Sequence, residues 1–283
     1  MNNQPLPKYD DDGFGITAAE PWFKQKVQII QEYLTAFVTN LAGRVDELIF
    51  VDLFSGSGLY SLGTKREIFA GTPLMALEQN LPIQRYVFCE HDADQLKALK
   101  IRVNKYYRGK NVILLDGKPG ELLEKLKLYI PVSKGNFKAA VFCVCDPFSL
   151  DIPFDTVEKL SNLGFNFLMP FTFALNKRLN YRYYLKEDKE KLKRYLGGNK
   201  DLDRLAKGSD SNTQFYKRLI QIYENNLLAN GLNASTSVHK LDSGLMEMPV
   251  YYMGLFSRQY STKAIQQDVE ATHKTQFELF NEQ

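Results

Sequence analysis

The sequence predicts an α/β protein with a mostly parallel, doubly wound sheet. Along most of the first 175 residues, short apolar runs alternate with helical patterns, which is typical of βαβ units with helices on both faces of a sheet. The first long run ends in a Gly-x-Gly turn, and two strand-like runs lie close together near the end of the chain. We therefore expect a seven-stranded sheet with an antiparallel terminal strand.

The positions of the expected elements follow from hydrophobic periodicity. Apolar side chains recur every three or four positions over residues 22–41, which predicts an amphipathic helix. The expected parallel strands are residues 47–54, 85–90, 111–116, 137–146 and 165–173. Helical patterns occupy residues 92–107, 121–129 and 155–163. Runs at 235–241 and 249–257 predict the terminal strand pair.

These patterns divide the chain into five parts. We expect a flexible lead-in over residues 1–20, an α/β core with its N-terminal helix over 21–175, and a helical, basic insertion over 176–232. Residues 233–260 would complete the sheet, and 261–283 would form a helical tail.

Composition limits the class of protein. Hydrophobic residues make up 44% of the 283 positions and charged residues 24%, as in ordinary globular domains. The formal net charge of +3 is too small to predict polyanion binding by itself, so any basic surface is local. No apolar run reaches the roughly 18 residues of a membrane span, and the first twenty residues lack signal-peptide regions. We expect a cytoplasmic protein without a membrane partner.

The three cysteines each fall within an apolar, strand-like run. Their odd number and the missing secretory signal favour reduced thiols. Cys143 and Cys145 are two positions apart and no Cys/His pair supplies further ligands. We predict no metal site.

The turn after the first strand is the first candidate binding element. It reads Asp52-Leu-Phe54-Ser55-Gly56-Ser-Gly58, and its glycines allow the backbone to approach a ligand closely. Ser61 stands where a dinucleotide fingerprint has its third glycine. A loop of about a dozen residues also separates the turn from Thr72. Both features disfavour an NAD-dependent oxidoreductase, while a purely structural turn remains an alternative.

Acidic residues close three further strands, at the edge where open α/β sheets bind ligands. Glu90 is placed to accept hydrogen bonds from ribose hydroxyls, with His91 beside it as a turn residue. Asp116-Gly117 could receive an adenine amino group. Asp146-Pro147-Phe148 could hold a substrate amine while the ring stacks on a planar base. Solvated carboxylates and rigid loops would give the same patterns.

In their order and spacing, these motifs resemble class I S-adenosylmethionine-dependent methyltransferases, and more closely the three-Cys-motif partner protein (TcmP) family. The resemblance covers about residues 20–175. The matching stretches are KQKVQIIQEYLTAF (24–37), FVDLFSGSGLY (50–60), AGTPLMALE (70–78), VFCEHD (87–92) and DPFSLDIPFDTVEKL (146–160). It implies a Rossmann-type methyltransferase fold, S-adenosylmethionine as cofactor, and a partner protein that bears a cysteine motif.

The resemblance also implies roles for the strand-end residues. Asp52, Gly56 and Gly58, with Phe54 and Ser55 between them, would contact the methionine moiety. Glu90 and His91 would lie at the ribose, and Asp116 with Gly117 at the adenine. Asp146, Pro147 and Phe148 would form the catalytic turn that faces the methyl acceptor.

One departure concerns the catalytic turn. Methyltransferases that act on base amino groups usually carry two prolines in this motif, whereas Cys145-Asp146-Pro147-Phe148 has one. Methylation of a base nitrogen therefore stays open, while cofactor binding does not depend on the second proline.

The segment after Asn176 is locally basic. Residues 176–207 contain eleven Lys or Arg against five Asp or Glu, interleaved with tyrosines. Cations and aromatic rings together are what single-stranded nucleic acid requires, and a solvated helix with buried tyrosines would look similar. The candidate nucleic-acid contacts are Lys177, Arg178, Arg182, Tyr183, Lys193 and Arg194.

Together these features predict an S-adenosylmethionine-dependent methyltransferase that acts on nucleic acid, either a base or RNA. The alternative is a non-catalytic module that binds S-adenosylmethionine or a nucleotide and serves a phage-related or defence system through its partner.

Overall fold

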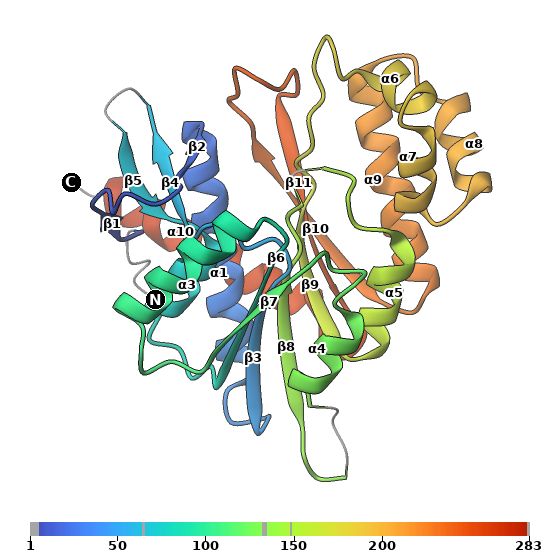
Figure 1. Cartoon of the computed structure of the whole chain (residues 1–283). Helices are drawn as coiled ribbons and strands as arrows, with labels where there is room; N and C mark the ends of the chain where they lie inside the picture. The colour runs from blue at the N-terminus through green and yellow to red at the C-terminus, as the bar shows by residue number, and fades with distance from the viewer. Residues whose placement is uncertain (1–5, 64–65, 132–134, 148, 282–283) are drawn as a thin grey trace.

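A computed structural model describes residues 6–63, 66–131, 135–147 and 149–281, with residues 272–281 described by their backbone alone (Figure 1). Its central element is a seven-stranded sheet of order β10-β11-β9-β8-β3-β6-β7. The strands are β3 (Glu47–Asp52), β6 (Arg85–Glu90), β7 (Val112–Asp116), β8 (Ala139–Val144), β9 (Phe165–Pro170), β10 (Asn233–Lys240) and β11 (Val250–Ser257).

The strand order confirms the predicted fold class. Strands β7, β6, β3, β8 and β9 are parallel, and β11 runs antiparallel to both β9 and β10. Among the strands of this sheet, β3 comes first in the sequence and lies in the middle of the five parallel strands, so the chain builds outward to β7 and then returns to β8. This reversal is the topological switch point at which open α/β sheets bind ligands. The protein has a Rossmann-type methyltransferase fold.

Helices cover both faces of this sheet (Figure 1). One face carries α1 (Pro21–Leu41), α3 (Ala93–Tyr106) and α10 (Thr262–Asn281), with α2 (Thr72–Glu78) packed on α1. The other carries α4 (Leu123–Tyr129), α5 (Phe154–Asn162) and α9 (Asn212–Ala229). Every residue of β8 and β9 is buried, which explains why these strands read as continuous apolar runs rather than alternating ones.

Residues 176–232, expected to be a helical insertion, contain α6 (Tyr181–Lys186), α7 (Lys189–Leu196), α8 (Asn199–Lys207) and α9. Three tyrosines of this segment lie in its interior: the ring of Tyr195 stacks on that of Tyr223 with 4.6 Å between centroids, and the ring of Tyr184 stacks on that of Phe215 with 5.8 Å. Within the described residues, no helix has both the length and the apolar character that crossing a bilayer demands.

The N-terminal segment differs from the flexible lead-in that we expected. Strands β1 (Lys8–Tyr9) and β2 (Thr17–Ala19) join a second sheet, of order β1-β5-β4-β2, with β4 (Leu59–Leu62) and β5 (Glu67–Ala70). The stretch before Thr72, expected as a loop, is thus largely a β-hairpin. We refer to residues 6–20 as the N-terminal strap.

A buried arginine holds the N-terminal strap in place. Arg102 of α3 is fully buried and donates two hydrogen bonds of 2.8 Å to the carboxylate of Asp12. It also donates to the carbonyl oxygens of Gly15 at 3.1 Å and Ser57 at 2.7 Å. One guanidinium therefore joins the strap, α3 and the glycine turn after β3. Asp12 lies in the segment that we expected to be a flexible lead-in, and the sequence does not reveal its distant partner.

We expect Asp12→Asn to lower the free energy of unfolding by about 3–5 kcal/mol, because it leaves the Arg102 charge buried without a carboxylate. Urea unfolding measures the change. Asp10→Asn, at an exposed position of the same strap, should shift stability by less than about 0.5 kcal/mol. Equal effects of the two substitutions would show that Arg102 does not anchor the strap.

Candidate functional site

A cavity of about 430 Å³ lies at the carboxyl ends of β3 and β8, between α1 and the N-terminal strap. Three residues predicted as site residues line it: Asp52, Phe54 and Asp146. The complete lining is Thr17, Ala18, Ala19, Glu20, Trp22, Phe23, Lys26, Asp52, Phe54, Tyr60, Thr72, Asp146 and Leu245. We call this space the central cavity.

The Asp146 carboxylate is fixed at both oxygens. Its Oδ2 forms a close ion pair with Nζ of Lys26, whose side chain is 1% exposed, and its Oδ1 accepts a hydrogen bond of 3.1 Å from Thr172. Burial lowers the pKa of the Lys26 amine, and the charge of Asp146 opposes that shift. The amine also lies 4.1 Å from the ring centroid of Phe23, within the range of a cation–π contact.

Asp52 ends β3 and is almost completely buried. Its Oδ1 accepts a hydrogen bond of 3.0 Å from the backbone N–H of Phe54. The pKa of Asp52 is raised to about 7, chiefly by burial and also by the nearby carboxylates of Asp146 and Glu90, against the lowering effects of the Phe54 N–H and of Lys26. A cation placed in the central cavity would stabilise the ionised form of this carboxyl.

Tyr60 lies near all three acidic groups. Burial raises the pKa of its phenol, and the charges of Asp146, Asp52 and Glu90 add to the shift. The hydroxyl is therefore neutral at ordinary pH, with three carboxylates near it. The three strand-end acids Asp52, Glu90 and Asp146 thus lie close enough together for each to raise the pKa of the same phenol.

Glu90 itself holds the glycine turn. Its Oε2 accepts a hydrogen bond of 2.8 Å from the N–H of Gly56, and its Oε1 accepts bonds of 2.8 Å from the N–H groups of His91 and Asp92. A carboxylate has about four acceptor positions, so three are used by the protein. Glu90 is absent from the lining of the central cavity.

The rest of the glycine turn is packed against protein. Gly56 has φ +60, and a Cβ there would lie 3.3 Å from the side chain of Gln95 and 3.5 Å from Tyr60. Gly58 has φ +84, and a Cβ there would lie about 3 Å from the side chains of Leu74 and Leu99. The hydroxyl of Ser55 donates to the carbonyl of Cys89. The positive φ angles explain the glycines, and Ser55, Gly56 and Gly58 do not line the central cavity.

Asp116 and Gly117, predicted near an adenine, lie one strand further out. Asp116 pairs with Glu90 in the β6–β7 register and is exposed. The N–H of Gly117 donates to the carbonyl of Glu90 at 3.2 Å. His91 is largely exposed, with Nδ1 3.2 Å from Glu90 Oε1. These residues adjoin Glu90 without lining the central cavity.

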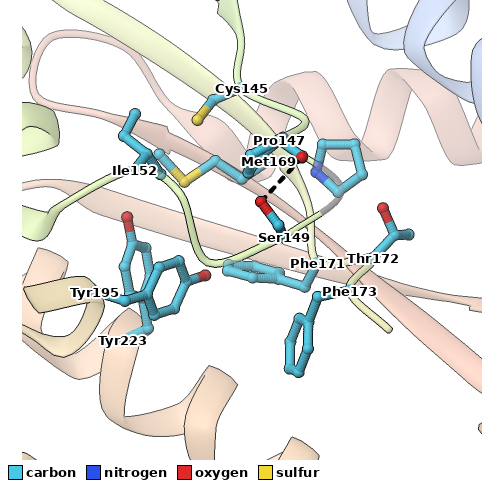
Figure 2. A pocket seen from close by; sticks show the side chains of 11 residues that line it. Cys145, Pro147, Ser149, Ile152, Met169, Phe171, Thr172, Phe173, Tyr195 and Tyr223 are labelled. Atoms are coloured by element: carbon cyan, nitrogen blue, oxygen red, sulfur yellow. Dashed lines mark hydrogen bonds between the residues drawn. The ribbon is translucent and has the colours of Figure 1, made fainter. Parts of the chain in front are cut away.

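Pro147, predicted to belong to the catalytic turn, is not among the residues that line the central cavity. Pro147 lines a small, nearly filled space of about 10 Å³ on the side of the insertion rather than the central cavity (Figure 2). There, Ser149 donates to the carbonyl of Pro147 at 3.2 Å, and the stacked rings of Tyr195 and Tyr223 lie beside Phe171. Phe148 lies outside the described residues.

The candidate nucleic-acid contacts lie mainly on the exterior of the insertion. Lys177, Arg178, Arg182 and Arg194 are exposed, and Tyr183 and Lys193 are half-buried. The guanidinium of Arg182 lies 5.5 Å from the ring centroid of Tyr181. Tyr184 and Tyr195 belong to the interior of the insertion and offer no face for stacking.

Sequence reasoning missed Lys26, Tyr60 and Thr172. A signal existed for Lys26 alone: it lies four positions after Trp22, where a lysine interrupts the buried face of α1. Tyr60 and Thr172 reach the site through the β4–β5 hairpin and the segment after β9, which local patterns do not connect with Asp52.

No family model matches this chain, and no curated protein matches it. Among solved structures it is similar to protein LPL1258 from Legionella pneumophila, with 13% identity over 86% of this chain and 90% of that one and a TM-score of 0.48. An rRNA methylase from Streptococcus thermophilus shows 12% identity over 82% and 96%, with a TM-score of 0.39. An O-methyltransferase from Bacillus cereus in complex with SAH shows 9% identity over 82% and 80%, with a TM-score of 0.43. At these identities no activity passes to this chain, and the TcmP resemblance stays a prediction.

Asp52 should make stability depend on pH. A carboxyl with a raised pKa binds more protons in the folded state than in the unfolded state, where its pKa is about 4. We therefore expect the free energy of unfolding of the wild type, measured relative to Asp52→Asn, to fall as the pH rises from about 4 to about 7 and then to level off. Urea unfolding across this range measures it, with exposed Asp203→Asn as control. Parallel curves for wild type and Asp52→Asn would contradict the raised pKa.

Proposed function

We propose that this protein is an S-adenosylmethionine-dependent methyltransferase that acts on nucleic acid. The observation that carries the proposal is the pair of carboxylates, Asp52 and Asp146, that project from adjacent strands at the switch point into one cavity, with buried Lys26 paired to Asp146. Strand-end groups of this kind can hold a ligand and a second reactant side by side.

The acidic groups of the site support a ligand that carries an ammonium group. Asp52 is a buried carboxyl without a lysine or arginine ion pair among the described residues, so an ammonium group would suit it. Glu90 keeps one acceptor position for a hydroxyl after its three backbone hydrogen bonds. When bound, S-adenosylmethionine would supply an electrophilic methyl group on a sulfonium.

The residues of the central cavity then orient the acceptor. Asp146 retains acceptor capacity at both oxygens, so it can take a hydrogen bond from an acceptor amine or hydroxyl and direct the lone pair of that atom. Lys26 and Thr172 fix the carboxylate in place, which reduces the reorganisation needed during reaction. Phe23, Tyr60 and Trp22 also line the central cavity, and aromatic side chains of this kind suit a planar base.

A nucleic-acid acceptor is supported by the exposed cations of α6 and α7, since phosphates are bound chiefly through Lys and Arg. We also propose that the protein acts together with a partner that bears a cysteine motif, as the TcmP resemblance implies.

A second candidate is a module that binds the cofactor or a nucleotide without catalysis. The engagement of Glu90 with three backbone N–H groups favours it, because a carboxylate that holds its own turn has little capacity left for a ribose. Formation of S-adenosylhomocysteine separates the two candidates: an enzyme produces it with a suitable acceptor, and a module does not.

Ligand binding tests the cofactor assignment. A ligand at one hundred times its Kd stabilises the folded state by about 2.7 kcal/mol, which corresponds to a Tm increase of about 5 °C for a chain of this size. We expect this increase with S-adenosylmethionine and S-adenosylhomocysteine and none with NAD, measured by thermal unfolding. Stabilisation by NAD alone would refute the proposal.

Asp146→Asn tests the catalytic assignment. The amide keeps an oxygen toward Lys26 but loses the charge, so we expect methyl transfer to fall at least about 100-fold while the Kd for S-adenosylmethionine changes less than about threefold. Methyl transfer is followed as S-adenosylhomocysteine formation with single-stranded RNA and DNA. Asp155→Asn on α5, outside the cavity, should behave as wild type. Unchanged turnover in Asp146→Asn would remove Asp146 from the mechanism.

A further inference from the structure

A second hollow, of about 320 Å³, lies where the insertion meets the sheet. Its walls come from three places: the turn after β7, the loop that follows Asp146, and α7. The lining residues are Lys118, Gly120, Glu121, Leu150, Asp151, Pro153, Lys191 and Arg194. We propose that this hollow, which we call the basic pocket, binds a backbone phosphate of a single-stranded nucleic-acid substrate; the substrate class rests on the proposed function.

The charges of the basic pocket favour an anion. Asp151 is neutralised by Lys191, whose Nζ lies 2.7 Å from Asp151 Oδ1. Glu121 accepts a hydrogen bond of 3.3 Å from the N–H of Lys118, within its own turn. Lys118 and Arg194 are exposed and have no ion-pair partner among the described residues. Three cations and two carboxylates thus line the hollow, which leaves one net positive charge and two cations, Lys118 and Arg194, without an ion-pair partner among the described residues.

The chemistry of these two cations suits a phosphate. The planar guanidinium of Arg194 can donate two parallel hydrogen bonds to neighbouring phosphate oxygens, and the ammonium of Lys118 can act as a point charge on a third. The apolar side chains of Leu150 and Pro153 line the pocket as well, so part of the water around a bound anion would be displaced.

The position of the basic pocket links it to the central cavity. Leu150 follows Asp146 by four residues, and four extended residues span at most about 14 Å. One loop therefore carries Asp146 toward the central cavity and forms a wall of the basic pocket. A short oligonucleotide can reach both, with a base in the central cavity and a phosphate some nucleotides away between Lys118 and Arg194.

The test uses single-stranded DNA and RNA oligonucleotides that carry one uncharged methylphosphonate at successive positions. With the wild-type protein, saturated with S-adenosylhomocysteine, we expect affinity to fall at least about tenfold when the uncharged group replaces the phosphate held by the basic pocket. In Lys118→Gln/Arg194→Gln, affinity for the unmodified oligonucleotide should fall similarly, and the methylphosphonate should cost nothing further at that position.

The matched control is Lys200→Gln/Lys207→Gln on α8, which removes the same charge from exposed positions outside the pocket. It should keep the wild-type dependence on methylphosphonate position. The logarithmic salt dependence of binding should decrease by about 0.7 in the pocket variant for one lost phosphate contact, and less in the control.

Two results would overturn the proposal: equal loss of affinity in the pocket variant and the control, or a methylphosphonate effect that persists in the pocket variant. Competition by inorganic phosphate without any dependence on methylphosphonate position would also overturn it, because the pocket would then hold free phosphate only. Binding is measured without turnover, and cofactor binding by the pocket variant is checked separately. Failure of the basic pocket is thereby distinguished from failure of the methyltransferase assignment.

Discussion

The ion pair between Lys26 and Asp146 is the constraint on which the site depends. Both charges are removed from most of the surrounding water, and burying an ion pair is favourable only when the geometry is good and the remaining polar positions are satisfied. Thr172 satisfies the second oxygen of Asp146, and the Phe23 ring covers the amine. Because Lys26 belongs to α1 and Asp146 follows β8, the pair also fixes the N-terminal helix against the switch point of the sheet.

The glycine turn is likewise fixed by hydrogen bonds with neighbouring charged side chains. Glu90 reaches from the end of β6 to the N–H of Gly56, while Arg102 reaches from α3 to the carbonyl of Ser57. The turn is thus held at the N–H of Gly56 by a carboxylate and at the carbonyl of Ser57 by a guanidinium. Its conformation is set before any ligand arrives, which reduces the entropic cost of binding.

Much of the fold could be predicted from the sequence, and less of the site. The β6 boundaries and the helix at α1 followed from periodicity, because buried parallel strands and amphipathic helices leave local patterns. That Asp52 and Asp146 lie close together could be predicted because the strand ends of a parallel sheet share one edge. Lys26, Tyr60 and the order of the N-terminal strap depend on contacts between distant segments, such as Arg102 with Asp12. The orientation of Pro147 toward the insertion could not be predicted, because a Pro turn fixes one dihedral angle and not the direction of the loop.

The aromatic cluster in Figure 2 has a mechanical consequence. Phe171, Tyr195 and Tyr223 leave only about 10 Å³ of space beside Pro147 and Ser149, and closely packed interiors transmit displacement rather than absorbing it. A tilt of α7, which carries Tyr195, would therefore push the loop that begins at Asp146. Close packing of these rings thus couples the position of α7 to that of the loop that carries Asp146.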